Sequence, residues 1–237
     1  MDWYYGSHLS SENIFKSIDE IKNYGGNMIQ IFVSNPIGKP SKDSLEKYKK
    51  IGTEIKKYSI NNLTNIVIHS PYTLNFAKEF NEESYWIKNL ILELRIAHEI
   101  GALGCVIHVG KYLEIEKVRG IENMLNSLKY IISIIKKEKL DSIIILETAS
   151  GQGTELLVTE DNTLDELSNF YHRFTKEEKK KIKICVDTCH IYSGGFDIST
   201  KKKVRYFFLL FERMIGLEYL ALIHFNDSKT EYINNLL

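Results

Sequence analysis

The chain has 237 residues with 43% hydrophobic content, enough to bury one large core. Lysine plus arginine and aspartate plus glutamate number 31 each, so the composition does not indicate a polyanionic partner, although it is compatible with a local basic surface. Cys105, Cys185 and Cys189 are too few for a disulfide framework and favour an intracellular, reducing compartment. With no leader-like start and no apolar run of about eighteen residues, we expect a soluble, unprocessed chain without a membrane segment.

Short apolar runs alternate with amphipathic stretches in the first half of the chain. The predicted strands are residues 4–8, 28–33, 66–69 and 105–108. Ser10 or Ser11 is expected to cap a helix that ends at Gly25–Gly26, and a lysine-rich helix should follow over about 44–58. Residues 35–40 hold two of the three prolines and predict a loop.

The same alternation continues through the second half. The predicted strands are residues 143–147, 184–187 and 220–224, with helices over about 118–135, 164–174 and 204–214. Strict alternation is typical of a parallel sheet with right-handed crossovers, either an open doubly wound sheet or a (β/α)₈ barrel. We favour an α/β fold with a single TIM barrel domain over residues 1–237. Side chains of the kinds that bind metals end nearly every predicted strand. This is typical of a barrel, in which the carboxyl ends of eight strands meet at one rim.

Histidine and carboxylate side chains gather at the predicted strand ends. They are His69, His108, Glu147, Asp187 with His190 just after it, and His224. Imidazole and carboxylate ligands without converging thiolates suit Zn²⁺, Mn²⁺ or Fe²⁺, and this number of ligands exceeds what one tetrahedral ion uses, so we expect at least two ions. For residues 184–190 alone, a core strand with a capping Asp187 and a surface His190 is an equally good interpretation.

Six short motifs lie along the chain. They are Gly6–Ser10, Gln30–Phe32 with Asn35–Pro36, His69 with Tyr72 and Asn75, Glu147 with Gly151–Gly153, Asp187–His190, and His224–Lys229. These motifs resemble those of the endonuclease IV family of apurinic/apyrimidinic endonucleases, which are zinc-dependent (β/α)₈ enzymes of DNA repair. The resemblance covers nearly the whole chain, and the Asp-Thr-Cys-His sequence at 187–190 is the family's own.

The resemblance implies a zinc-dependent endonuclease of base excision repair that cleaves the DNA backbone 5′ to abasic sites in double-stranded DNA. We expect it to act as a monomer in the cytoplasm or nucleus. The implied metal ligands are His69, His108 and Glu147 for one zinc, Glu147 again with Asp187 and His224 for a second, and His190 for a third. Glu147 is then the central catalytic carboxylate, because it bridges two ions.

The resemblance also implies contacts to DNA by Asn35, Tyr72 and Lys229. Asn35 and Lys229 could instead cap loops, and Tyr72 could pack at the rim. Many relatives carry Arg or Gln after the Asn-Pro pair, whereas this chain has Ile37, an apolar side chain that could wedge between bases.

The last residues depart from the family pattern. After Lys229 the family continues into a D-x-H motif and an eighth strand with a glutamate ligand, neither of which is found in this sequence. We therefore expect an eighth strand and helix that are missing or atypical. We also expect at most two zinc ions per chain, with His190 unliganded, because one histidine alone does not retain Zn²⁺ against water.

Two other functions remain open on the sequence alone. A sugar or sugar-phosphate isomerase resembling xylose isomerase would use carboxylates and histidines at the same rim, around one or two divalent ions. A catalytically incomplete, DNA-binding remnant is the alternative that is not an enzyme. Activity on free sugars would favour the first, and binding of abasic duplex without incision would favour the second.

Overall fold

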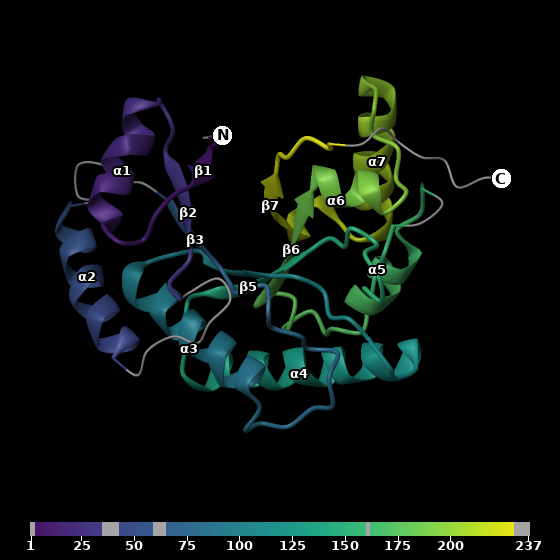
Figure 1. Cartoon of the computed structure of the whole chain (residues 1–237), viewed down its shortest axis with the longest axis horizontal. Helices are drawn as coiled ribbons and strands as arrows, with labels where there is room; N and C mark the ends of the chain where they lie inside the picture. The colour runs from purple at the N-terminus through teal and green to yellow at the C-terminus, as the bar shows by residue number, and fades with distance from the viewer. Residues whose placement is uncertain (1–2, 35–42, 59–64, 160–161, 230–237) are drawn as a thin grey trace. The chain divides into compact units, whose positions relative to one another are not determined.

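The structure is a computed structural model that describes residues 3–34, 43–58, 65–159 and 162–229. Strands and helices alternate along these residues (Figure 1). The strands are β1 (Gly6–His8), β2 (Met28–Ile31), β3 (Asn65–His69), β4 (Gly104–Ile107), β5 (Ile143–Glu147), β6 (Ile182–Asp187) and β7 (Leu220–His224). The helices are α1 (Ile14–Asn23), α2 (Ser44–Tyr58), α3 (Tyr85–Ile100), α4 (Lys117–Lys137), α5 (Asp165–Tyr171), α6 (Thr188–Ser193) and α7 (Lys201–Met214), with a short 3₁₀ helix η3 (Leu217–Tyr219) before β7. None of these helices combines the length and the apolar character needed to cross a membrane.

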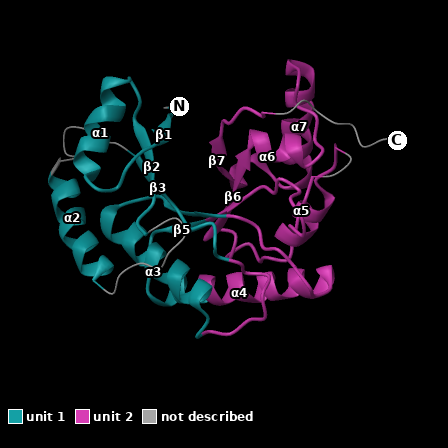
Figure 2. Ribbon diagram, viewed as in Figure 1, with its two compact units in different colours: residues 1–74, 83–107, 133–144 teal, residues 75–82, 108–132, 145–237 magenta. Residues whose placement is uncertain are grey.

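Within the described residues, the seven strands follow one another in chain order in the sheet. Strand pairs β1–β2, β2–β3, β3–β4 and β6–β7 are parallel. Parallel neighbours need a crossover connection between them, and the helices supply it. The predicted α/β class with a parallel sheet is therefore confirmed. The chain divides into two compact units, which are described separately (Figure 2).

Unit 1 comprises residues 1–74, 83–107 and 133–144, shown in teal in Figure 2. Its strands are short and mostly apolar, and the core side chains with no exposed surface include Ile29, Ile31, Val67 and Ile68. Helix α2 packs against α3, and α1 packs against β2. A strand covered on both faces reads as a continuous apolar run, which is why residues 66–68 gave a clear signal in the sequence.

Unit 2 comprises residues 75–82, 108–132 and 145–237, shown in magenta in Figure 2. Strand β5 ends in this unit at Glu147. Strands β6 and β7 pair so that Asp187 lies opposite His224. The apolar faces of α5 and α7 bury Phe170, Phe207 and Phe211. The register of β6 against β7 therefore determines which polar groups meet at the carboxyl ends of these strands.

The predicted cap of the first helix is wrong. Neither Ser10 nor Ser11 is the N-cap of α1. Asn13 has this role, and its side-chain oxygen accepts a hydrogen bond of 3.1 Å from the backbone N–H of Lys16. The Ser10 hydroxyl accepts instead from the backbone N–H of Glu12 at 3.2 Å, so it stabilises the turn before the helix.

Several predicted strand and helix ends are also wrong by a few residues. Strand β1 begins at Gly6 instead of residue 4, and β2 ends at Ile31 instead of residue 33. Strand β4 ends at Ile107, so His108 is the first residue after it. Helix α5 ends at Tyr171, before Phe174. Residues 230–237, where the atypical eighth element was expected, lie outside the described residues.

Candidate metal centre

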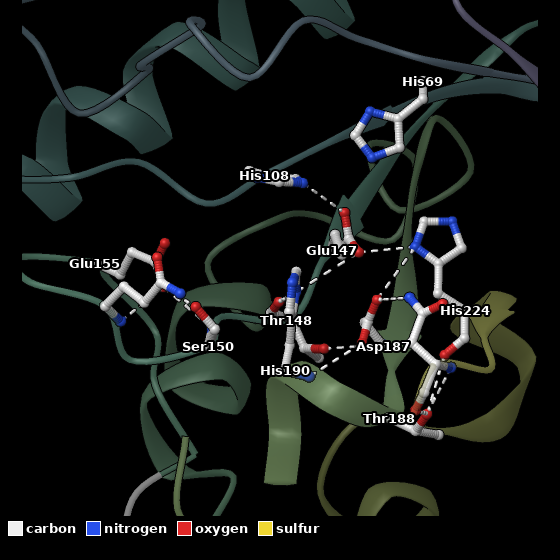
Figure 3. A network of polar contacts seen from close by, with 12 residues as sticks. His69, His108, Glu147, Thr148, Ser150, Glu155, Asp187, Thr188, His190 and His224 are labelled. Carbon is white, nitrogen blue, oxygen red and sulfur yellow. Dashed lines mark hydrogen bonds and ion pairs between the residues drawn. The ribbon is translucent and has the colours of Figure 1, made fainter. Parts of the chain in front are cut away.

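The carboxylate of Glu147 lies at the centre of the polar cluster in unit 2 (Figure 3). Glu147 is the last residue of β5 and is only 2% exposed. Its Oε1 lies 2.7 Å from Nδ1 of His224, and its Oε2 lies 3.0 Å from Nε2 of His108. The two oxygens of one carboxylate therefore face two different histidines.

Asp187 is the last residue of β6 and the N-cap of α6, so no loop separates the two elements. Its Oδ1 accepts a hydrogen bond of 3.0 Å from the backbone N–H of His190, which is the N-cap interaction of α6. Its Oδ2 accepts a hydrogen bond of 2.6 Å from Asn226 Nδ2 and lies 3.7 Å from Nδ1 of His224. Asp187 can therefore cap the helix and bind a metal, because the two roles use different oxygens.

The His190 ring is held by the loop that follows β5. Its Nδ1 donates to the carbonyl oxygen of Thr148 at 2.9 Å, since a carbonyl can only accept. This bond leaves Nε2 as the nitrogen that can bind a metal. The Thr148 hydroxyl also accepts a hydrogen bond of 3.0 Å from the backbone N–H of Asp187. Thr148 therefore supports both Asp187 and His190.

The donor atoms in unit 2 fit a divalent ion. Glu147, Asp187 and His190 each offer a ligand atom, and these atoms lie within 4.8 Å of one another. Nitrogen and oxygen ligands each about 2 Å from one zinc ion lie about 3–4 Å apart. The carboxylate oxygens and histidine nitrogens of this cluster lie 2.7–3.7 Å apart, close to that spacing. Carboxylate and imidazole ligands are those that Zn²⁺ and Mn²⁺ accept.

The charge of this cluster needs a cation. Burial lowers the pKa of His224, but its hydrogen bonds to Asp187, Cys185 and Glu147 outweigh burial and raise the pKa to about 12. Burial raises the pKa of the neighbouring Cys185 thiol to about 11. Two buried carboxylates thus favour positive charge at this place, which either an imidazolium or a divalent ion can supply.

His69 belongs to unit 1, at the carboxyl end of β3, and is 4% exposed. Its Nδ1 donates to the carbonyl oxygen of Ser70 at 2.8 Å, which again leaves Nε2 for a metal. Its ring centroid lies 5.5 Å from that of Phe32 and 5.6 Å from that of Tyr72. Tyr72 is 56% exposed, so an aromatic surface is presented beside the histidine.

The other predicted DNA contacts are Lys229, Asn35 and Ile37. Lys229 is exposed, at the end of the segment that follows β7. Asn35 and Ile37 lie outside the described residues.

The structure adds residues that the sequence did not single out. Glu155 accepts hydrogen bonds of 3.0–3.1 Å from the hydroxyl and N–H of Ser150 and from the N–H of Gln152, so it holds the glycine-bearing loop after β5. Thr148 and Asn226 support Asp187 and His190, as described above. Phe225, directly after His224, is 91% exposed. The only signal for these residues in the sequence was their position within or next to the recognised motifs.

Comparison with known proteins defines the class of this chain. The xylose isomerase-like TIM barrel family matches residues 18–234, nearly the full length. A relative from Acanthamoeba polyphaga mimivirus that carries the name endonuclease 4 is 33% identical over 236 residues, which are 95% of this chain and 72% of that protein. The protein is therefore a xylose isomerase-like TIM barrel, as the fold and the polar strand ends indicate. Within that class, the chain belongs to the endonuclease IV family.

Two solved structures share the fold. Endonuclease IV from Thermus thermophilus matches with a TM-score of 0.69 and 21% identity, covering 98% of this chain and 79% of that chain. D-psicose 3-epimerase from Clostridium cellulolyticum matches with a TM-score of 0.62 and 13% identity, covering 92% of this chain and 72% of that chain. The predicted TIM barrel class is confirmed. Because an endonuclease and an epimerase both match, the fold alone does not decide the activity.

Proposed function

We propose that the chain is a zinc-dependent DNA repair endonuclease that cleaves the phosphodiester backbone 5′ to abasic sites. The observation that carries the proposal is the carboxylate of Glu147, whose two oxygens face His108 and His224 at 3.0 and 2.7 Å. A carboxylate shared in this way can bridge two ions. Relatives that carry the name endonuclease 4 support the DNA backbone as the substrate.

The proposed ligand sets follow the family resemblance. His69, His108 and Glu147 would hold one ion, and Glu147, Asp187 and His224 would hold a second. The separation of the Glu147 oxygens between His108 and His224 supports this division. The distances in unit 2 also favour His190 as a ligand, since it lies with Glu147 and Asp187, and this differs from the expectation that it stays unliganded.

Zinc bound by these residues would generate hydroxide from water near neutral pH and neutralise charge on the phosphate. The residues of the chain orient the ligands. Thr148 fixes the ring of His190, and Asn226 fixes one oxygen of Asp187. An abasic nucleotide is already unstacked, so moving it out of the duplex to such a centre costs little. Exposed Tyr72 and Phe225 offer aromatic faces for nucleotides.

The test is incision of a duplex oligonucleotide that contains one tetrahydrofuran residue, with and without added Zn²⁺. We expect a single cut on the 5′ side of the tetrahydrofuran residue, dependent on metal and absent from an undamaged duplex. Absence of incision with protein in stoichiometric excess contradicts the proposal. Tight binding of the abasic duplex without incision would then support the DNA-binding remnant.

The runner-up function is isomerisation or epimerisation of a sugar. The match to D-psicose 3-epimerase favours it only at the level of the fold, at 13% identity. The same purified protein should be incubated with free ketohexoses and pentoses. Interconversion of these sugars, together with no incision of DNA, would replace the endonuclease by an isomerase.

A further inference from the structure

The side chain of Glu93 is a buried carboxyl of unit 1. It lies on α3 and is 0% exposed. Its Oε1 accepts a hydrogen bond of 2.8 Å from the Ser34 hydroxyl, and its Oε2 accepts one of 2.5 Å from the Ser70 hydroxyl. Ser34 follows β2 and Ser70 follows β3, so one carboxyl connects the chain segments that leave two neighbouring strands.

Burying this group is costly. Burial raises the pKa of Glu93 to about 7, although the hydroxyls of Ser70 and Ser34 act to lower it. An apolar side chain of similar volume at such a position generally costs no stability and often adds some. Packing alone therefore does not explain a carboxyl on the buried face of α3, where Leu90 and Leu94 are fully buried and Asn89 is the other buried polar side chain.

Ser70 connects Glu93 to His69. The Ser70 carbonyl accepts from Nδ1 of His69 at 2.8 Å, and its backbone N–H donates to the carbonyl of Val106 at 2.9 Å. Its hydroxyl is held by Glu93. Ser70 is thus fixed at three points, and the orientation of its carbonyl determines which nitrogen of His69 is left for a metal and where it points.

We propose that Glu93 is a positioning residue that orients His69 for metal binding by holding Ser70, with Ser34 as its second anchor. The inference rests on the proposed function, because it takes His69 as a metal ligand. Glu93 itself contacts neither metal nor substrate. Its hydrogen bonds restrict the motion of Ser70, whose carbonyl accepts from His69. The imidazole ring of His69 therefore has its metal-binding orientation before metal binds.

The test compares Ser70→Ala and Glu93→Gln with the matched control Ser142→Ala. Ser142 is also 0% exposed, and its hydroxyl donates to the carbonyl of Leu94 on α3 at 2.7 Å instead of to Glu93. Zinc affinity is measured by competition with a chromophoric chelator, separately from incision. We expect Ser70→Ala and Glu93→Gln each to weaken zinc binding about 10- to 100-fold, as substitutions of groups that support a ligand do.

The double variant distinguishes positioning from general destabilisation. If Glu93 acts through Ser70, the combined substitution weakens zinc binding no more than the stronger single one. Ser142→Ala should lower the midpoint of urea unfolding and leave zinc affinity unchanged. Wild-type zinc affinity in Ser70→Ala and Glu93→Gln, or losses that simply add, would overturn the inference.

The outcome is separable from that of the proposed function. A chain that binds zinc and shows this coupling without incising abasic DNA keeps the role of Glu93 and loses the endonuclease. A chain that incises abasic DNA with unaltered zinc affinity in both variants keeps the endonuclease and loses the role of Glu93. A wild-type chain that binds no zinc overturns both.

Discussion

The carboxylate of Glu147 lies 2.7 Å from Nδ1 of His224, although 77 residues separate the two in the chain. Both groups are largely shielded from water, with side-chain exposures of 2% for Glu147 and 14% for His224. A buried carboxylate without a compensating partner costs several kcal/mol, so the burial of Glu147 favours a cationic partner, which an imidazolium or a metal ion can supply. The unfavourable burial of Glu147 is thus directly linked to its proposed role.

The first prediction concerns Glu147→Gln. We expect the substitution to remove bound metal and incision together, with a loss of at least about 100-fold in kcat/KM, because it withdraws charge from two ions at once. Metal content by elemental analysis and incision of the tetrahydrofuran duplex are measured on the same preparation. Glu122→Gln is the control, since Glu122 forms an ion pair with Arg173 at 2.6 Å and should affect neither measurement. Unchanged metal content in Glu147→Gln would show that the ligand assignment is mistaken.

Metal removal should destabilise the protein. We expect chelation to lower the melting temperature and added Zn²⁺ to restore it. Free zinc at one hundred times its dissociation constant stabilises the folded chain by about 2.7 kcal/mol. Differential scanning fluorimetry before and after dialysis against a chelator measures the shift. A melting temperature that is the same with and without metal is the contradicting result, and the number of zinc ions that rebind tests the expected maximum of two.

Phe225 is predicted to contact DNA. Its ring is 91% exposed directly after His224, and stacking of a base on an aromatic side chain contributes about 1–3 kcal/mol. Phe225→Ala should therefore raise KM for abasic duplex about 5- to 100-fold and leave metal content unchanged. Tyr206→Ala is the control, because Tyr206 is an exposed aromatic residue on α7, and its removal should not alter KM. Equal effects of the two substitutions would argue against a specific contact.

Glu155→Gln should loosen the loop at 150–152. Burial alone would raise the pKa of Glu155, but hydrogen bonds from Ser150 and Gln152, with Lys111 nearby, hold the pKa below its usual range. The stability that Glu155 contributes is present above the pKa of an unfolded carboxyl and is lost as pH falls through the folded pKa. We expect the substitution to cost about 1–3 kcal/mol at pH 7 and less in acid, measured by urea unfolding. Glu114→Gln, at an exposed position, is the control.

The contribution of Glu93 to the free energy of unfolding depends on pH in the opposite direction. Burial raises its pKa from 4.5 to about 7, so the folded chain binds this proton more tightly than the unfolded chain. The stabilisation by the protonated carboxyl is complete below pH 4.5 and is lost as pH rises to 7, a change of about 3 kcal/mol. Urea unfolding of wild type and Glu93→Gln, both without metal, should therefore differ in their pH dependence over this range. Parallel curves would show that Glu93 titrates normally.

The sequence predicted the residues that end a periodic apolar run or belong to a short motif. Glu147 and His224 each end an apolar run, so their position at strand ends could be predicted, and the structure has β5 and β7 with the expected bounds. His190 was expected just after a strand, and it follows β6 in the first turn of α6. For Asp187 the sequence left two interpretations, a helix-capping residue or a residue of the site. Both apply, because Asp187 caps α6 and also faces His224.

Other features depend on tertiary contacts that no local pattern shows. Glu93 was not singled out, because only Asn89 is a polar partner near it in sequence and the two hydroxyls that hold its carboxyl come from distant segments. Its partners Ser34 and Ser70 lie 59 and 23 residues away. Asn226 supports Asp187 from a distance of 39 residues for the same reason. The cap of α1 was misplaced, because Ser10, Ser11 and Asn13 all have capping side chains and only the packing of the helix selects among them.

The hydrogen bond from the backbone N–H of His190 to Asp187 has a consequence for the order in which the protein folds. It spans three residues, so it can form as soon as the turn from β6 into α6 exists. The contact between Glu147 and His224 closes a loop of 77 residues. Closing such a loop lowers the conformational entropy of the chain before the contact can stabilise it, so this contact is expected to form late. If the proposed ligand set binds metal, high-affinity binding would therefore begin only once β7 lies beside β6, because a nascent chain still lacking β7 has only part of this set.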